Sequence, residues 1–354
     1  MSDVPKKSQG WVVYPIGSKP KMGLAFLLGA QQFLTQFGAT VIIPIIVGGA
    51  MGLPTEELAL LISTMFFCAG ITTLIQQSPI GNRLPILQGG TFSFLGPMFA
   101  IVGMCAAEGL GWQVMIQQVS AAVMVASLFE IIIGYTGLMG MIKRAFSPIV
   151  IGPTIAMIGL ALYGVGAPWM AGNWVISLIT LVAIVIFSQI LSRKSKVFAL
   201  FPILLAVILG WVCSWIGTAA GWIPEGNPAN LKNGIELIRS APAFWFRPAI
   251  PFKWGFPAFN AITVAGALGM LAGYIGSMIE SVGDYYSCAR ISEAPVPTEK
   301  LISRGIGAEG VGCFVAGIFQ TCNGTTSYSE NIGSIGLTRV ASRRVIRCAA
   351  IILL

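Results

Sequence analysis

The segment from Ser327 to Arg339 reads Ser-Tyr-Ser-Glu-Asn-Ile-Gly-Ser-Ile-Gly-Leu-Thr-Arg, and the expected fold is organised around it. It lies between two strongly apolar regions, yet it places the carboxylate of Glu330 beside the amide of Asn331, followed by Gly333 and Gly336. The stretch is too polar and too short to cross a membrane alone. Because a bilayer tolerates such backbone and charge only where protein or a water-filled cavity covers them, it is predicted to line a site.

The composition predicts a chain that lies in a lipid bilayer. Of its 354 residues 55% are hydrophobic and only 10% are charged, and the mean hydropathy is +0.82. A soluble domain carries about 25% charged residues. Apolar windows of about 20 residues, the length of a helix that crosses the hydrocarbon core, recur along the whole sequence. The fold class expected is an all-α polytopic membrane protein.

The residue types that the chain lacks exclude several functional classes. It has no histidine, which removes histidine metal ligands, serine–histidine triads and histidine proton relays. The seven cysteines are scattered and never form a C-x-x-C pair, so neither a metal site nor a disulfide framework is indicated. The polar residues offer no nucleophile–base pair. No enzymatic activity, metal or cofactor is expected.

The basic residues predict the orientation. A net charge of +8 could indicate nucleic-acid binding, but threading the spans below leaves nearly all lysines and arginines on one side. The exceptions fall in one long loop and are Lys232, Arg239, Arg247 and Lys253. By the positive-inside rule the amino terminus is expected in the cytoplasm, with the protein in the plasma or inner membrane and no nucleic-acid partner.

Eleven membrane segments are expected, of which the third and the tenth are interrupted. The third carries the Gly89-Gly90 pair and Pro97, which should break a continuous helix into an extended piece and a half-helix. The tenth holds the opening stretch. The segments are expected at about 22–48, 57–76, 84–105, 112–138, 147–165, 174–192, 198–217, 262–286, 302–320 and 325–337, with the last beginning near 341.

The two interrupted segments occupy matching positions if the span at 262–286 is the counterpart of the first span. Interrupted helices at corresponding places in two halves indicate an inverted-repeat transporter whose site lies near the bilayer midplane. Repeats of seven segments must have opposite topology, because seven is odd. Four of the seven elements of the second repeat are present, so the chain is expected to be truncated after about eleven of fourteen segments. The span at 262–286 also carries Gly269 and Gly273, a G-x-x-x-G pair expected to admit another backbone.

Five acids are expected inside the membrane, where each carboxylate costs about 2.5–3.5 kcal/mol. Glu130 and Glu309 lie nearer the ends of their spans and are assigned structural roles, by snorkelling or by pairing with a base. Glu280, Asp284 and Glu330 lie deeper, beside glycine-rich backbone, and are assigned functional roles. Glu280 and Asp284 are one helical turn apart and should stack on one side of their span.

The deep acids favour a small planar ligand with several N–H donors, because carboxylates accept hydrogen bonds. Backbone N–H groups near Phe92 and Glu330, where the half-helices start, would serve ligand carbonyls, and the Phe92 ring can stack on the ligand. A nucleobase presents both kinds of edge, whereas an anion would be repelled unless one acid were protonated. Asp284 is either a second proton or cation acceptor or an anchor to the Gln31-Gln32 pair, which itself has either an interhelical or a site role.

Four motifs resemble the nucleobase–ascorbate transporter family. They are Gln31-Gln32 before Phe-Gly-Ala-Thr, Gly-Gly-Thr-Phe-Ser-Phe at 89–94, Glu-Ser-Val-Gly-Asp-Tyr-Tyr-Ser at 280–287 and Glu-Asn-Ile-Gly-Ser-Ile-Gly-Leu-Thr-Arg at 330–339. The resemblance covers essentially the whole chain and implies a homodimer of fourteen-segment subunits, each with a core and a gate domain. The chain should then divide into a cytoplasmic tail (1–21), core segments one to four (22–138), gate segments five to seven (139–218), an extracellular loop (219–260) and core segments eight to eleven (261–354).

The resemblance also implies roles for individual residues. Those expected to bind the substrate are Glu280, Glu330, Phe92, Ala39 and Ser329. Those expected to handle coupling or the proton are Asp284, Glu280, Gln32 and Asn331. Gln32 stands where the family usually has a histidine.

The substrate signals point in two directions. Glu330-Asn331 resembles the uracil type, whereas residues 280–290 resemble the ascorbate and purine types. A second carboxylate in the pocket disfavours ascorbate, which is an anion at neutral pH. The function expected is a secondary active importer of a nucleobase, uracil or a xanthine-like purine, that works by proton symport with alternating access. The alternative is a sodium-coupled symporter of ascorbate or another organic anion on the same fold, and a channel is less favoured.

Overall fold

The structure is a computed structural model that describes residues 11–138, 148–195, 197–198, 201–232, 234, 248–257 and 259–354. Within these residues the chain is helical, apart from one small sheet of two strands. The first ten residues of the expected tail, the first nine of the expected gate and most of 233–247 in the expected loop lie outside the described part.

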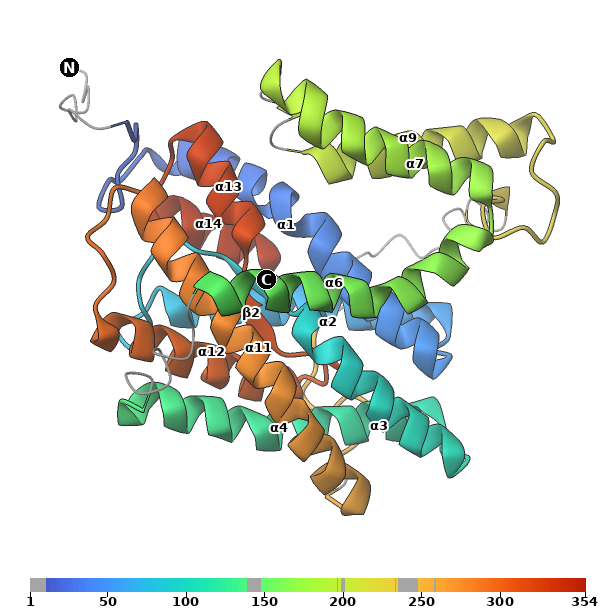
Figure 1. Cartoon of the computed structure of the whole chain (residues 1–354), viewed down its shortest axis with the longest axis horizontal. Coiled ribbons are helices and arrows are strands. Elements are labelled where there is room, and N and C mark those ends of the chain that lie inside the picture. The colour runs from blue at the N-terminus through green and yellow to red at the C-terminus, as the bar shows by residue number, and fades with distance from the viewer. Residues whose placement is uncertain are drawn as a thin grey trace. The chain divides into compact units, whose positions relative to one another are not determined.

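Six of the described helices are long and apolar enough to cross a membrane (Figure 1). They are α1 (Met22–Met51), α2 (Thr55–Gln76), α4 (Trp112–Thr136), α7 (Trp174–Val185, continued by the π-turn η3 Ile186–Ile190 and by η4 Leu191–Arg193), α11 (Ala261–Ile291) and α12 (Glu299–Ile318). The other elements are η1 (Phe92–Phe94), α3 (Leu95–Ala107), α6 (Pro148–Ala171), α9 (Pro202–Ala219), α13 (Ser329–Thr338) and α14 (Arg343–Leu353). The expected polytopic all-α class is confirmed.

Most expected spans are right to within a few residues, and the largest differences are at α6, which ends at Ala171 instead of 165, and at α11. The start of α11 is fixed by a capping box between Asn260 and Thr263, as the local sequence favours. Its end lies at Ile291, five residues beyond the expected 286. The helix continues because Tyr285, Cys288 and neighbouring side chains remain in the core, so packing outweighs the polar composition of this turn.

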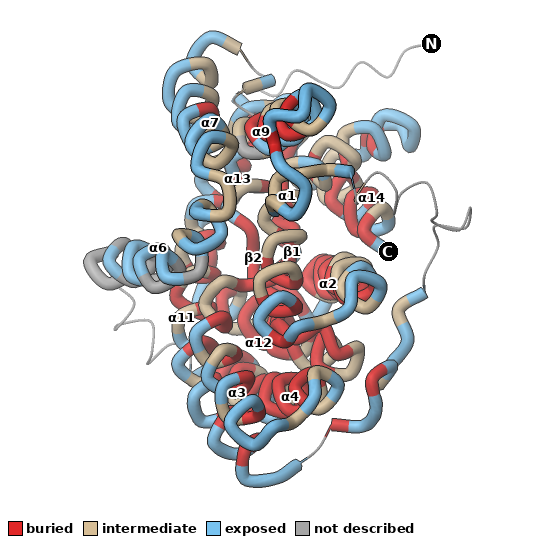
Figure 2. The backbone as a smooth tube through the Cα atoms, turned by 90° about the vertical axis from the view of Figure 1, so that its right-hand side faces the viewer, coloured by how far each residue is buried: buried red, intermediate tan, exposed pale blue. Residues whose placement is uncertain are grey.

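The chain divides into two compact units. One comprises residues up to Ile158 together with Pro248–Leu354, and the other comprises Gly159–Arg247. In the first unit the strands β1 (Gln88–Gly90) and β2 (Thr325–Ser327) lie among α1, α2, α11 and α12. Figure 2 shows both strands as buried backbone surrounded by these helices.

The two strands account for both interrupted segments. β1 pairs with β2 antiparallel, with Gln88 opposite Ser327 and Gly90 opposite Thr325. A helix begins shortly after each strand, η1 with α3 after β1 and α13 after β2. Backbone polar groups that are buried in a membrane protein must be paired, and here each broken segment pairs with the other. An extended piece leading into a half-helix is therefore confirmed, and Pro97 lies in the first turn of α3, where it displaces no helical hydrogen bond.

Glycines set the closest helix contacts of the first unit. A methyl group on Gly134 of α4 would lie 2.2 Å from the backbone nitrogen of Gly307 on α12. On α11, a methyl group on Gly273 would lie 3.0 Å from the carbonyl oxygen of Ser93, as the G-x-x-x-G pattern predicts. Gly269, the other member of that pair, has open space around it, so its predicted contact is wrong for this unit. The close contact of α11 with η1 is instead made by Gly273 and Gly276, which lie nearer to Glu280.

Replacing Gly134 by alanine is expected to destabilise the protein by about 1–3 kcal/mol or more, because the added methyl group meets backbone that cannot move aside. Gly103→Ala is the matched control, since Gly103 lies inside α3 and a methyl group added there would meet nothing within 4 Å. Thermal unfolding in detergent should show a lower midpoint for the first variant and an unchanged or higher midpoint for the second. Equal midpoints would contradict this packing.

The segment from Trp11 to Pro20 lies along the connection between α13 and α14. The Val13 and Tyr14 amides both donate to the Arg339 carbonyl, at 2.9 and 3.1 Å. Tyr14 also forms an isolated parallel bridge with Val340, and Ser342 donates to the Ser18 carbonyl at 2.8 Å. The described part of the predicted polar tail is thus fastened to the first unit.

Candidate functional site

The candidate site is built around the ends of the two strands. Because the strands are antiparallel, the half-helices start at opposite ends of the pair, with Phe92 beyond Gly90 and Ser329 beyond Ser327. Side chains extend the pairing, since the Asn323 amide bonds the backbone N–H and C=O of Thr91 at 2.9 and 3.1 Å. The two half-helix starts are therefore held in a fixed relation by a buried scaffold.

Glu280 and Glu330 approach this scaffold from two helices. Glu280 lies on α11 and Glu330 in the first turn of α13, and α11 packs against α13. Their carboxyl groups are close enough to interact electrostatically. Glu330 is held near its own backbone N–H and the Ser329 hydroxyl, whereas the Glu280 carboxylate makes no hydrogen bond within the described residues. Both side chains are partly exposed, so they remain open to a ligand.

The other predicted lining residues surround the same place. Phe92 and Ala39 are half-buried and Ser329 is exposed. η1 packs on α11, where a methyl group on Gly276, four residues before Glu280, would lie 3.4 Å from Ser93. Thr40, next to Ala39, donates to the hydroxyl of Tyr328 at 3.3 Å, which brings α1 to the start of α13. All five predicted substrate-binding residues thus come from elements that meet at the strand ends.

Asp284 belongs to a buried polar network. It is 8% exposed, and its Oδ2 accepts a hydrogen bond from the Ser327 hydroxyl at 2.8 Å. Ser327 lies 3.2 Å from the Ser281 hydroxyl, which donates to Glu309 Oε2 at 2.5 Å. Two hydroxyl groups therefore connect the carboxylates of Asp284 and Glu309. Asp284 is bonded to β2, and the alternative of an anchor to the glutamines of α1 finds no hydrogen bond among the described residues.

Glu309 lies deeper than the sequence predicts. It was expected near the start of its span, where it could snorkel or pair with a base, but it lies in the middle of α12 and is fully buried. Its Oε1 accepts hydrogen bonds from Tyr285 at 2.7 Å and from Gln76 at 3.4 Å, and no described base forms an ion pair with it. Its partners Ser281 and Tyr285 lie on one face of α11, but nothing in the sequence connects that face to α12, so no local signal marks Glu309.

Gln32 and Asn331 fasten α1 to α13. The Asn331 Nδ2 donates to Gln32 Oε1 at 2.8 Å, and its Oδ1 accepts from the Leu87 backbone N–H at 3.0 Å. Both side chains are buried, which agrees with the interhelical role of the glutamine pair. An amide does not titrate near neutral pH, so these two residues hold the start of α13 in place without carrying a proton themselves.

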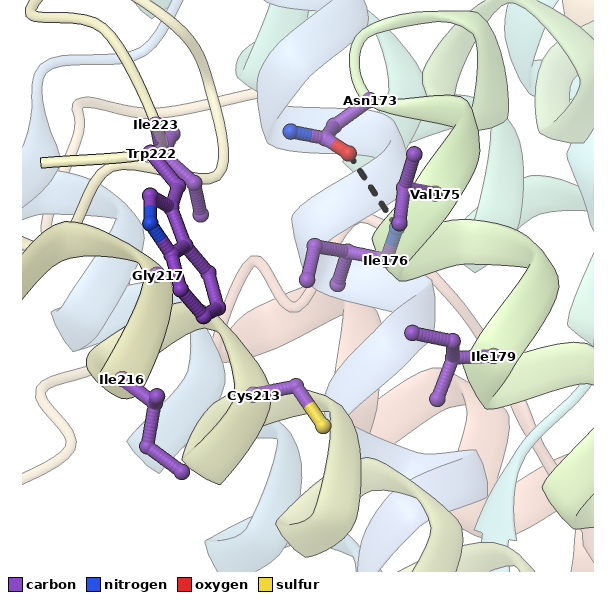
Figure 3. A pocket seen from close by; sticks show the side chains of 9 residues that line it. All are labelled: Asn173, Val175, Ile176, Ile179, Cys213, Ile216, Gly217, Trp222 and Ile223. Carbon is purple, nitrogen blue, oxygen red and sulfur yellow. Dashed lines mark hydrogen bonds between the residues drawn. The ribbon is translucent and has the colours of Figure 1, made fainter. Parts of the chain in front are cut away.

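A separate cavity of about 350 Å³ lies within the second unit (Figure 3). Its lining comes from α7, α9 and the residues that follow α9, and it is mostly aliphatic and aromatic. Asn173 is the one amide in the lining, and its oxygen accepts from the Ile176 N–H at 3.1 Å, as the dashed line shows. Its nitrogen donates to Asn227. The cavity therefore offers few polar groups to a polar ligand, and the candidate site remains the acid pair of the first unit.

Comparisons with known proteins point to one family. The model of a permease family, of the xanthine and uracil type, matches residues 23–354. Solute carrier family 23 member 2 of Mus musculus is 36% identical over 385 residues, which cover 97% of this chain and 58% of the relative. Nucleobase-ascorbate transporter 2 of Arabidopsis thaliana is 35% identical over 351 residues, which cover 95% of this chain and 66% of the relative. The chain spans about three fifths of the length of the curated solute carriers that it matches.

Proposed function

Because the chain belongs to the xanthine/uracil permease family, a family of transporters and not of enzymes, we propose that it is the substrate-binding part of a secondary active transporter. The proposed cargo is a nucleobase, uracil or a xanthine-like purine, imported across the plasma or inner membrane by proton symport. The observation that carries this proposal is the approach of Glu280 and Glu330 at the start of a half-helix, within a unit that places no described base beside them.

The geometry supports an uncharged ring with N–H donors. Glu280 makes no hydrogen bond within the described residues and so has free acceptor capacity, and the Glu330 carboxyl group lies close enough to interact with it electrostatically. The first N–H groups of α13 have no helical partner and can donate to a ring carbonyl, aided by the positive end of the helix dipole. We assign Phe92 to stacking on the ring and Ala39 to the wall opposite. An anion would meet two carboxylates with no compensating base, which disfavours ascorbate.

We assign coupling to the chain of groups from Asp284 to Glu309. A carboxyl group that is buried without a basic partner holds a proton more readily, and the hydroxyls of Ser327 and Ser281 can pass that proton by reorienting. Asp284 is the proposed proton acceptor nearest to Glu280, one helical turn away. In this scheme Gln32 and Asn331 hold the start of α13 in position. Their part in coupling is then structural, and neither residue carries the proton.

Replacing Ser327 by alanine is expected to slow proton-driven uptake by about 10- to 100-fold while base binding persists, because it interrupts the hydroxyl chain between the two acids. Ser334→Ala is the matched control: Ser334 is also buried, lies on α13 and makes no side-chain hydrogen bond within the described residues. Uptake into proteoliposomes under an imposed pH gradient, with equilibrium binding measured on the same protein, separates the two effects. Loss of binding and uptake together would contradict the relay role.

We further propose that the first unit is the core and the second the gate, in an inverted repeat that works as a homodimer with a cytoplasmic amino terminus. The division of the chain at Ile158 and Pro248 supports the first assignment, although it places the gate boundary later than the expected 139. The antiparallel pairing of β1 with β2, each followed by a half-helix, supports opposite topology of the repeats. The excess of basic residues at one end supports the orientation.

A second candidate is a sodium-coupled symporter of ascorbate or another organic anion. The charges of Glu280, Glu309 and Glu330 act on Asp284, and this excess of negative charge would attract sodium as well as a proton, although the described residues hold no group of three acids close enough together to bind a metal ion. Uptake of labelled uracil, xanthine and ascorbate under separate proton and sodium gradients decides between the two. Uptake of a base that follows the proton gradient supports the proposal, and uptake of ascorbate that requires sodium overturns it.

A further inference from the structure

Three arginines gather where the turn after α2 meets the start of α14. The Arg343 Nε donates to the backbone carbonyl of Arg83 at 2.7 Å, and Arg83 Nε donates to the Ser78 carbonyl at 3.3 Å. Arg347 lies one turn after Arg343 on α14. Both Arg83 and Arg347 are close enough to Arg343 to act on its charge. We call these three residues, Arg83, Arg343 and Arg347, the arginine cluster.

The arginine cluster has no counter-charge within the part of the chain that the structure describes. None of its members forms an ion pair there, and the ion pair that is found joins Lys232 and Glu225 elsewhere. Arg343 is only partly exposed, while Arg83 and Arg347 are exposed. Like charges held this close repel one another, and partial burial weakens the screening by water. The hydrogen bonds to backbone carbonyls fix two guanidinium groups in position but do not neutralise them.

The surroundings of the arginine cluster are those of a membrane surface. After Arg347 the chain continues as Cys-Ala-Ala-Ile-Ile-Leu-Leu, so the cluster lies where an apolar helix begins. Ile80, three residues before Arg83, is 48% exposed. Nearby, the ring of Trp11 packs at 5.1 Å from the Arg339 guanidinium and remains partly exposed, as aromatic side chains do at headgroup level. A ligand here would meet charge at one end and apolar surface at the other.

We propose that the arginine cluster binds the phosphate of an anionic phospholipid headgroup. Guanidinium groups match phosphate oxygens through paired N–H donors, and basic pockets at the ends of membrane helices bind such headgroups. The phosphate would sit among Arg83, Arg343 and Arg347, with an acyl chain along Ile80 and the apolar part of α14. This lipid neutralises the cluster and ties the turn after α2 to the start of α14.

The test measures binding of phosphatidylglycerol to the purified protein in detergent by native mass spectrometry, with phosphatidylcholine as the neutral lipid. Wild-type protein should retain phosphatidylglycerol over phosphatidylcholine. Each arginine removed should weaken that binding by about fivefold, so Arg343→Gln with Arg347→Gln should weaken it by about 25-fold. The control is Arg290→Gln with Lys300→Gln, which removes the same charge from exposed positions outside the cluster and should leave binding unchanged.

Three outcomes overturn the proposal. They are equal binding of the two lipids, equal loss in the control variant, and complete displacement of the lipid by millimolar inorganic phosphate, which would assign the cluster to a free anion. If Arg343→Gln does not fold, Arg347→Gln alone decides. The Arg347 side chain is exposed and makes no hydrogen bond within the described residues, so the fivefold loss is expected without an effect on folding.

Discussion

Replacing Glu280 by glutamine is expected to weaken nucleobase binding by about 10- to 150-fold. The change keeps the shape of the side chain and removes the charge that strengthens a hydrogen bond from a ring N–H, and such charge-assisted bonds contribute about 1.5–3 kcal/mol. The Glu280 carboxylate has no hydrogen-bond partner among the described residues, so its loss should not unsettle the fold. Equilibrium binding of labelled uracil and xanthine to the purified variant measures the effect.

Glu108→Gln is the control for this prediction. Glu108 follows the last residue of α3, at the opposite end of that helix from Phe92, and is exposed, so the same chemical change there should leave binding intact. The thermal midpoint of both variants should match that of the wild type. A Glu280→Gln protein that folds and binds the base with unchanged affinity would remove Glu280 from the site.

Replacing Asp284 by asparagine is expected to abolish accumulation while leaving exchange of the base across the membrane. The Ser327 hydroxyl can still donate to an amide oxygen, so the local structure should persist, but an amide cannot take up a proton. With one proton per base, a pH gradient of one unit supports about tenfold accumulation, since it stores about 1.4 kcal/mol. That ratio should fall to about one in the variant. Proteoliposomes that measure gradient-driven uptake and counterflow in parallel record both quantities.

An Asp284→Asn protein that still accumulates the base about tenfold would contradict the coupling role. Loss of counterflow as well as accumulation would instead indicate that Asp284 supports the fold or holds the ligand directly. Glu108→Gln again serves as the control, because it removes a carboxylate at an exposed position outside the polar network.

The interrupted segments could be predicted from the sequence because their cause is local. Gly89-Gly90 interrupts the third segment, and the polar residues that begin at Ser327 interrupt the tenth. A half-helix begins shortly after each interruption, at Phe92 and at Ser329. The pairing between the two segments could not be predicted in register, since the long chain between Gly90 and Thr325 must first fold back correctly. The spacing of the segments along the chain predicts that both exist and that they occupy matching positions in the two repeats. Which backbone groups pair depends on tertiary packing.

The positions of the acids could be predicted in part. Glu280 and Asp284 share a helix face and Glu330 opens a half-helix, all of which follow from position along the chain. The burial and hydrogen bonds of Glu309 could not be predicted, because a carboxylate in a span looks the same in sequence whether it snorkels or accepts several hydrogen bonds. Its partners Gln76, Ser281 and Tyr285 come from two other helices, so no local pattern records them.

Glu130 marks a further limit of sequence reasoning. It is fully buried on α4, and neither carboxylate oxygen satisfies the geometry of a hydrogen bond with a described residue, although the Cys313 thiol is close enough to interact. It was expected to snorkel or to pair with a base, but it is shielded from solvent and forms no ion pair with a described base. Close packing of α4 on α12 through glycines encloses it, and that depends on both helices together.

The central claim is that carboxylates from α11 and α13 hold a flat uncharged ring at the start of a half-helix. The measurement that tests it most directly is competition binding on the purified protein, with labelled uracil and labelled xanthine displaced by unlabelled uracil, xanthine or ascorbate. We expect saturable binding of a base that other bases displace and ascorbate does not. Binding of ascorbate alone, with neither base bound, would contradict it.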